Sequence, residues 1–183
     1  AGRQAACWGD VARDGNTRQR VLMKGVRQVA LATGYGCAVT GAGELTCWGK
    51  LPATDVALVL PKTLLAKVVD VSISDGFGCA AREDGSVWCW GRGEDFTLGD
   101  GSGIDSPAPV RAAGIDAAVK VAVRQGHACA LMRDPSLHCW GSGRGLASNL
   151  GVVTRPHRVL ERVDALSAGQ EICVRRGREW SCL

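Results

Sequence analysis

The 183-residue sequence predicts an all-β protein assembled from repeats, each containing a hairpin held by a disulfide. The first observation is a tripeptide, Cys-Trp-Gly, that recurs every 40 to 50 residues and has a degenerate copy at the end of the chain. The copies are Cys7–Gly9, Cys47–Gly49, Cys89–Gly91, Cys139–Gly141 and Trp180–Cys182. The second observation is another cysteine, nine or ten residues before each of the last four copies. A fixed period of this length is typical of repeat architectures.

Composition agrees with a single globular domain of strands. The chain is 46% hydrophobic and contains 25 glycines, and no long segment has apolar residues at helical spacing. We therefore expect one repeat domain over residues 1–183. Its repeats lie at approximately 1–9 (partial), 26–49, 68–91, 118–141 and 162–183. Between them, residues 10–25, 50–67, 92–117 and 142–162 are interpreted as turn-rich surface connectors of variable length.

Each repeat begins with a short alternating apolar segment, which predicts a strand. These segments are Val29–Leu31, Val69–Ile73, Val119–Val123 and Val163–Leu166. A polar or glycine-rich turn follows, then a strand that begins at the first cysteine, a tight turn, and a strand that ends in Cys-Trp-Gly. One repeat therefore supplies three antiparallel strands.

The tight turns place the two cysteines of a repeat opposite each other. Gly41–Gly43 and Glu83–Gly85 are three-residue loops with glycine last, where a positive φ is needed. Cysteines centred on such a loop are cross-strand neighbours, close enough to be joined if they face the same side. We predict the disulfides Cys37–Cys47, Cys79–Cys89, Cys129–Cys139 and Cys173–Cys182, with reduced buried cysteines as the alternative.

The leading copy of the motif lacks its upstream cysteine. The expected partner of Cys7 falls before Ala1, so we interpret Cys7 as unpaired or intermolecular. Either residues upstream of Ala1 or a second chain would supply the other half of this blade. The start at Ala1 rather than Met fits a mature secreted protein or a fragment of a longer chain.

Both faces of the predicted sheets are apolar. Leu45 and Cys47 point to one face of their strand, and Thr46 and Trp48 point to the other. Such a sheet must be covered on both sides, and a radial stack of small sheets meets this requirement. We therefore predict a β-propeller of about four cystine-pinned blades plus a half-blade, part of a larger ring. In this arrangement the tryptophans of the repeats pack between blades.

At this point the sequence resembles the regulator of chromosome condensation type of repeat, in its cysteine-bearing secreted bacterial form. The shared pattern runs from Cys-Ala-aliphatic through a turn with glycine to Cys-Trp-Gly, in residues 37–49, 79–91 and 129–141. Residues 92–110 keep the family's tail, with Leu-Gly-Asp-Gly and then Pro-Val. The resemblance implies a β-propeller, normally of seven blades, that acts by recognising other proteins.

The resemblance also places candidate binding residues at one end of the propeller. Thr33, Asp75 and Gln125 lie in the turns before the first cysteines, at the end that often forms a partner-binding face in the family. Tyr35, Phe77, His127 and Glu171 follow them at one repeat position, which in the family helps to pack the inner strand. Of these, we take Tyr35, Phe77 and His127 together with the turn residues as the candidate partner-binding set.

Several kinds of chemistry are disfavoured by the residues. No Cys-x2-Cys spacing suggests structural zinc, and His138 and Cys139 point to opposite faces of one strand, so we expect no metal site and no cofactor. No Gly-x-Ser-x-Gly elbow is present, and we assign no catalytic residues. The net charge of +4 is spread along the chain, which does not favour a nucleic-acid partner.

These expectations combine into one function with alternatives. Nine cysteines indicate an oxidising compartment, and no apolar run is long enough to span a membrane. We predict a secreted, non-catalytic module that recognises a protein partner or other copies of itself, through the repeat-face turns and the variable loops. The alternatives are a lyase or hydrolase at the ring axis, using Asp75, His127 and Glu171, and a carbohydrate-binding lectin.

Overall fold

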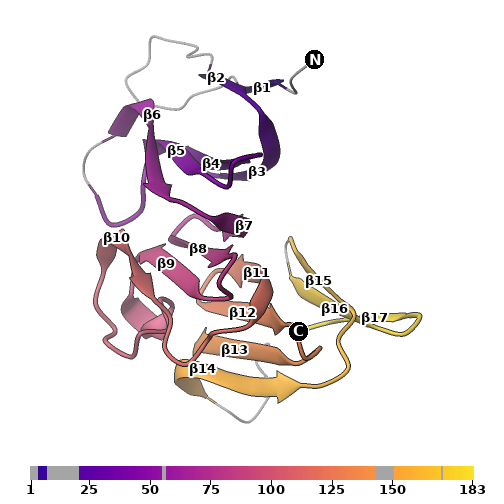
Figure 1. The fold of residues 1–183 in the computed structure, drawn as a ribbon. Helices are drawn as coiled ribbons and strands as arrows, with labels where there is room; N and C mark the ends of the chain where they lie inside the picture. The colour runs from indigo at the N-terminus through magenta and orange to yellow at the C-terminus, as the bar shows by residue number, and fades with distance from the viewer. Residues whose placement is uncertain (1–3, 8–20, 55–56, 143–150, 170) are drawn as a thin grey trace.

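The computed structural model describes residues 4–7, 21–54, 57–142, 151–169 and 171–183. Its strands form four antiparallel sheets that follow one another as the blades of a β-propeller, preceded by a two-stranded sheet (Figure 1). The predicted all-β class is confirmed. The only helical element in the described part of the chain is a short 3-10 helix, η1 (Glu94–Phe96), and no helix there could cross a membrane.

Each blade is a meander in which neighbouring strands in the chain are also neighbours in the sheet. Blade 1 contains β3 (Val26–Ala32), β4 (Tyr35–Thr40), β5 (Leu45–Lys50) and β6 (Ala57–Leu65). Blade 2 contains β7 (Val68–Ile73), β8 (Phe77–Arg82), β9 (Val87–Gly91) and β10 (Ser106–Arg111). Blade 3 contains β11 (Ala118–Arg124), β12 (His127–Met132), β13 (Leu137–Ser142) and β14 (Val152–Leu160). Blade 4 contains β15 (Ala165–Ala168), β16 (Ile172–Arg176) and β17 (Glu179–Cys182), and the leading sheet pairs β1 (Gln4–Cys7) with β2 (Val21–Lys24).

The connectors contain a fourth strand that the sequence did not predict. β6, β10 and β14 each pair with the Cys-Trp-Gly strand of their own blade and form its outer edge. All three contain proline, at Pro61, at Pro107 and Pro109, and at Pro156. Proline cannot donate to a strand ladder and is therefore tolerated on an edge strand, although in a sequence it reads as a break. The turn-rich interpretation of these connectors was wrong for the segments that form β6, β10 and β14.

All four predicted disulfides are present, one in each blade. The paired cysteines are direct cross-strand partners in their hairpins. Gly43 and Gly85 both adopt a φ of +79°, the left-handed conformation that the three-residue turns require.

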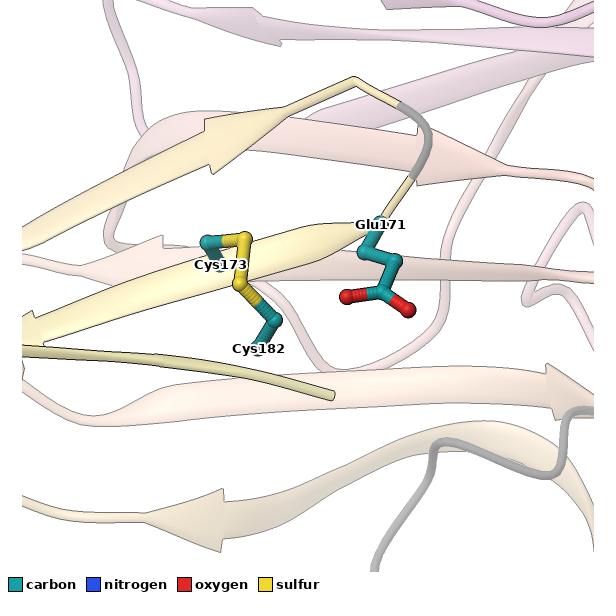
Figure 2. Close-up of side chains that lie close together, drawn as sticks. All are labelled: Glu171, Cys173 and Cys182. Carbon is teal, nitrogen blue, oxygen red and sulfur yellow. A yellow bond between two sulfur atoms is a disulfide. The ribbon is translucent and has the colours of Figure 1, made fainter.

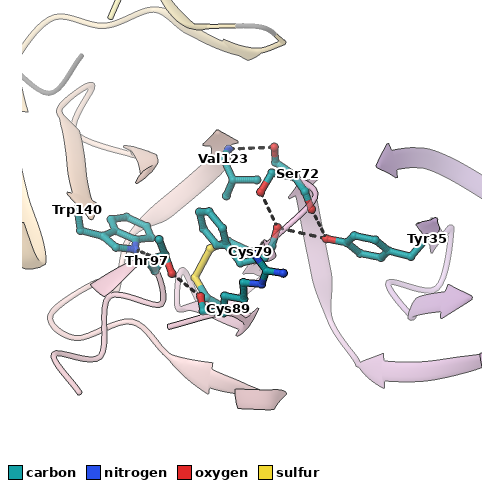
Figure 3. Close-up of a disulfide and its surroundings, with 10 residues drawn as sticks. Tyr35, Ser72, Cys79, Cys89, Thr97, Val123 and Trp140 are labelled. Carbon is teal, nitrogen blue, oxygen red and sulfur yellow. Dashed lines mark hydrogen bonds between the residues drawn. A yellow bond between two sulfur atoms is a disulfide. The ribbon is translucent and has the colours of Figure 1, made fainter. Parts of the chain in front are cut away.

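Adjacent blades pack through a repeated contact between a cystine and the following blade. Because successive side chains on a strand alternate faces, the cysteine and tryptophan of Cys-Trp-Gly point to opposite sides of their blade. Trp90 of blade 2 packs in the apolar cluster that contains the cystine of blade 1, and Trp140 of blade 3 packs with that of blade 2 (Figure 3). At the last interface Leu183 takes the place of tryptophan beside Cys129 and Cys139. The cores of the protein therefore lie between blades, as predicted.

The first strand of each blade lies nearest the axis. Residues of β3, β7, β11 and β15 together line a hollow of about 520 Å³ along the axis. Successive first strands contact one another from β3 to β7, from β7 to β11 and from β11 to β15. Among the described residues β15 and β3 make no comparable contact, and Figure 1 shows the blades as an arc around a common centre.

Asp70 joins the first strands of three blades. Its carboxylate accepts hydrogen bonds from Gln28 Nε2 of blade 1 at 2.9 Å and from the backbone N–H of Val121 of blade 3 at 2.8 Å. Burial raises the pKa of Asp70, and the two hydrogen bonds together with Lys120 and Arg27 oppose that rise. A buried carboxylate with these partners aligns the inner strands of blades 1 to 3.

Replacement of Asp70 by alanine should destabilise the protein. Asp70→Ala leaves the Val121 N–H without its acceptor in a buried setting, at a cost of about 1–3 kcal/mol in the free energy of unfolding. Asp70→Asn keeps one acceptor oxygen and should lose less. Urea denaturation of both variants beside the wild type measures the difference, and an alanine variant as stable as wild type would contradict the assignment.

Candidate functional site

The end of the propeller that carries the turns between first and second strands is hollowed. We call this end the turn face and define it by residues 33–34, 74–76, 125–126 and 169. A pocket of about 800 Å³ opens there. It is lined by residues of blades 1 to 4 and by the segment that follows β9, including Leu31, Ile73, Asp75, Phe77, Arg92, Glu94, Asp95, Thr97, Val123, Arg124, Gln125 and Gly169. Leu31, Ile73, Val123 and Gly169 also line the axial hollow, so the two spaces adjoin the same residues.

The glycine of each Cys-Trp-Gly motif holds one turn of the turn face in place. Gly91 has a φ of +111°, and a Cβ atom there would lie only 2.6 Å from the carbonyl oxygen of Gly76. That same oxygen accepts a backbone hydrogen bond from the N–H of Arg92 at 2.9 Å. Gly49 and Gly141 stand against the turns of blades 1 and 3 in the same way. The motif glycine is therefore required by the close approach of a turn.

Hydrogen bonds between blades fix the turns relative to one another. The backbone N–H of Thr33 donates to Asp75 Oδ1 at 2.8 Å, which joins the turns of blades 1 and 2. The phenol of Tyr35 donates to the carbonyl oxygen of Ser74 at 2.7 Å, with Phe77 O at 3.2 Å (Figure 3). Burial, and to a smaller degree the charge of Asp75, raises the pKa of Tyr35, which keeps the phenol a donor. This part of the turn face is preorganised.

The segment after β9 supplies one wall of the pocket. Thr97 accepts, through its carbonyl oxygen, a 2.8 Å hydrogen bond from Nε1 of Trp140 in the next blade, and its hydroxyl donates to Arg92 O (Figure 3). Arg92 and Glu94 are exposed and form a long ion pair of 4.0 Å. With Asp75, Asp95 and Arg124, the pocket carries side chains of both charges, a surface suited to polar contacts with a macromolecule.

His127 is buried beneath the turn face, with 1% of its surface exposed. Neither ring nitrogen has a hydrogen-bond partner among the described residues. Burial and then the nearby charge of Arg124 lower its pKa, and the backbone of Gln125 opposes the shift to a smaller degree. His127 is therefore held as the neutral imidazole.

The structure separates the candidate residues into two layers. Thr33, Asp75 and Gln125 are exposed on the turn face. Tyr35, Phe77 and His127 are buried below them, each with no more than 3% of its surface exposed. The exposed layer can touch a partner, and the buried layer supports the turns that carry it.

The residues of the enzymatic alternative are not brought to one place. Asp75 lines the turn-face pocket, whereas Glu171 does not line it and instead lines a neighbouring hollow of about 430 Å³ with Arg124, Ser167 and Cys173. His127 lines neither of these spaces. The three side chains therefore do not form a general acid–base constellation, which requires groups within hydrogen-bond reach of one substrate.

Sequence reasoning did not single out Arg92, Glu94 and Asp95 of the pocket wall. Asp95 and Phe96 both have a positive φ, of +61° and +60°. No sequence motif in this segment predicts two consecutive residues with a positive φ. The segment was interpreted only as part of a connector. The signal that was available is the local charge, since three charged residues follow closely after the Cys-Trp-Gly of blade 2.

One further cluster lies at the last blade. A carboxylate oxygen of Glu171 and the sulfur atoms of Cys173 and Cys182 all lie within 4.8 Å of one another (Figure 2). The two sulfurs form the disulfide of blade 4. Cys7 ends β1, and its side chain lies outside the described part of the structure, so its pairing stays a prediction.

Comparison with known families identifies the repeat. Residues 68–96 and 84–131 each match the regulator of chromosome condensation (RCC1) repeat. Comparison of the sequence with curated proteins gave no significant match.

Solved structures of similar fold include human WBSCR16, with a TM-score of 0.74, 18% identity and 86% of this chain covered. Prp20p of Saccharomyces cerevisiae, whose structure is described together with its binding to Gsp1p and histones, gives a TM-score of 0.68 at 18% identity over 85% of this chain. Yeast RCC1 (Prp20) bound by Kap60 gives 0.67 at 21% identity over 81%. This chain spans 48%, 45% and 39% of those proteins, or about half of their length or less.

The neutral state of His127 predicts a pH dependence of stability. Because the folded pKa is lowered, the unfolded chain takes up a proton first as the pH falls below the ordinary histidine value of about 6.5. The free energy of unfolding should therefore fall from that pH down to the folded pKa. In His127→Phe, which places the residue of blade 2 in blade 3, this loss should be absent. Urea denaturation at pH 7.5 and pH 5 measures it.

Equal pH dependence in His127→Phe and the wild type would contradict the assignment.

Proposed function

From the premise that this chain is a β-propeller of regulator of chromosome condensation type repeats, we propose that it is a secreted, non-catalytic protein-recognition module. Its recognition surface is the turn face, with the pocket of about 800 Å³ at its centre. The observation that carries the proposal is the arrangement of exposed turn residues from successive blades around this one pocket, above a buried and hydrogen-bonded layer.

The shape and chemistry of the turn face favour a protein as its ligand. The pocket is open and bears acids and bases together, including Asp75, Asp95, Arg92 and Arg124. Side chains of both charges around a broad opening can pair with the mixed charges of a protein surface, which gives orientation and specificity. The solved relatives support a protein partner, because Prp20 is described with Gsp1p, histones and Kap60.

Secretion is proposed from the four disulfides. Each blade carries one disulfide. Structural disulfides are typical of oxidising compartments, because thiols in the cytosol are kept reduced. A non-catalytic role is proposed because Asp75, His127 and Glu171, the residues of the enzymatic alternative, do not line one common pocket. No cofactor and no nucleic-acid partner form part of the proposal.

Self-assembly is the specific variant of this proposal. Among the residues that the structure describes, β17 pairs with β16 on one side only, whereas the equivalent strands β5, β9 and β13 each have an outer strand as well. In the same described part of the chain, β1 pairs only with β2. Open strand edges can pair with another chain, and Trp180 on β17 leaves 55% of its surface exposed for such a contact.

A photo-crosslinking residue should locate the recognition surface. Benzoylphenylalanine at Gln125 on the turn face should yield adducts with protein in the extracellular medium of the native host. The same residue at Glu83, an exposed turn at the opposite end of blade 2, should yield none. Mass spectrometry of the adducts is the readout. Equal adducts from both sites, or none from Gln125, would count against the turn face.

Light scattering after size exclusion tests self-assembly. The oxidised wild type should elute with at least twice the chain mass of 19.2 kDa. Trp180→Lys places a charge on the open edge and should return the protein to a single chain. Ile104→Lys, which changes another exposed apolar residue away from this edge, should not. A wild type that runs as one chain at all concentrations would exclude the self-assembling variant.

A further inference from the structure

One tryptophan of the repeats takes no part in the packing between blades. Trp48, Trp90 and Trp140 have no more than 2% of their surface exposed, and each belongs to an apolar cluster. Trp88, two residues before Trp90 on β9, is partly exposed and belongs to none of the clusters found among the described residues. The core of the protein therefore does not account for this side chain.

The repeat does not require an aromatic residue at this position. Trp88 lies in a row across blade 2, with Arg82 of β8 on one side and Arg111 of β10, its direct cross-strand partner, on the other. The equivalent residues are Thr40, Thr46 and Thr63 in blade 1, and Met132, His138 and Arg158 in blade 3. Three blades of the same fold thus carry three different rows, and the row of blade 2 places an indole between two guanidinium groups.

The indole of Trp88 is held in place by its neighbours. Its Nε1–H donates to the hydroxyl of Ser86 at 3.0 Å, and this hydroxyl donates in turn to Asp84 Oδ1. The guanidinium carbon of Arg82 lies over the indole ring, 6.0 Å from its centroid. Arg82 is fixed as well, since it donates to Ala66 O at 3.1 Å and pairs with Asp84 at 3.2 Å. The indole and this guanidinium group are therefore preorganised.

The charged groups around the indole form two ion pairs, so together they carry no net charge. Arg82 pairs with Asp84, and Arg111 pairs with Asp116. The two pairs are neighbours, because a Cβ atom at Gly85 would lie 2.3 Å from the carbonyl oxygen of Asp116. The side chains of Asp84, Arg111 and Asp116 are exposed. Exposed ion pairs add little to stability, and their donors and acceptors stay within reach of a ligand.

A neutral sugar matches this set of groups. The C–H face of a pyranose ring packs on an indole, and a sugar hydroxyl can accept a hydrogen bond from a guanidinium and donate one to a carboxylate. A strongly charged ligand is disfavoured, because each charge of the cluster already has a partner of opposite sign. Since the groups are exposed rather than enclosed, they suit one unit within a polymer better than a small free sugar.

We propose that Trp88, Arg82, Asp84, Arg111 and Asp116 form a binding site for a neutral polysaccharide of hexopyranose units. The site lies on blade 2 at the end opposite the turn face, and blade 2 has a neighbouring blade on each side (Figure 1). It therefore does not depend on the residues at either end of the chain. The turn face stays free for a protein partner, and sugar binding here would stand even if that face bound no protein.

Binding to immobilised polysaccharides tests the site. Fluorescently labelled protein in its oxidised form is applied to an array of neutral glucans, mannans and galactans, with polygalacturonate and heparan sulfate as acidic polymers. The wild type should bind at least one neutral polymer and neither acidic polymer. Trp88→Thr installs the residue that blade 1 carries at this position, and it should weaken binding about tenfold or more, since the indole supplies the apolar contact.

Trp180→Thr is the matched control, because Trp180 is an exposed tryptophan on another blade, and this variant should bind as the wild type does. Arg111→Gln should weaken binding, whereas Arg133→Gln, which changes an exposed arginine of blade 3, should not. No binding to any neutral polymer, binding to the acidic polymers alone, or equal binding by Trp88→Thr and the wild type would overturn the proposal. Urea denaturation of each variant shows whether the fold is retained, so that a loss of binding by unfolding is recognised.

The indole N–H signals in the NMR spectrum give a direct readout of contact in the unmodified protein. The chain contains six tryptophans, and the indole signal that is missing from Trp88→Thr identifies Trp88. A hexasaccharide of the bound polymer should shift this signal and leave those of the buried Trp90 and Trp140 in place. A shift of other indole signals with that of Trp88 unchanged would contradict the assignment.

Discussion

The placement of a cystine and an indole on opposite faces of the blades that carry Cys-Trp-Gly is the feature on which this structure depends. Cysteine and tryptophan are adjacent in the chain, so they face opposite sides of the same strand. The cystine of one blade therefore packs against the following blade, and the tryptophan of that following blade contacts it. Trp90 and Trp140 make this contact. Apolar burial then occurs between sheets and almost nowhere else, which explains why the blades stack radially.

A second, polar set of contacts aligns the blades near the axis. Asp70 bridges blades 1 and 3, and the hydroxyl of Ser72 accepts the N–H of Val123 at 3.0 Å (Figure 3). In blade 3 the residues at these two repeat positions are Lys120 and Ala122, which provide no acceptor for blade 4. Blade 4 is therefore held mainly by the apolar cluster around Leu166, Ile172 and Val174. The rigid part of the turn face lies over blades 1 and 2, where the Thr33–Asp75 and Tyr35–Ser74 contacts are found.

The sequence was sufficient for features that depend on local spacing. Cysteine separation and the turn glycines predicted the four disulfides, and the alternation around Trp48 predicted sheets covered on both faces. The sequence was insufficient where strand pairing between distant segments overrides the local preference of the residues. Pro61 and Pro156 suggested loops, yet their segments pair as edge strands. The partners of Asp70 lie more than 40 residues away in either direction, and no local pattern specifies them. The charged wall around Asp95 depends on backbone angles that the residue types there rarely adopt.

The motif glycines show which positions of such a chain can vary. A side chain at Gly91 would collide with the backbone of the turn at Gly76, whatever the protein binds. The tryptophan and the cysteines of the motif are likewise constrained, because they pack between blades. Thr33, Asp75 and Gln125, in contrast, are exposed on those turns, and their side chains can change without moving the blades. The residues by which the repeat is recognised and the residues available to a ligand are therefore separate sets. New binding specificities can arise on this scaffold while its recognisable motif stays the same.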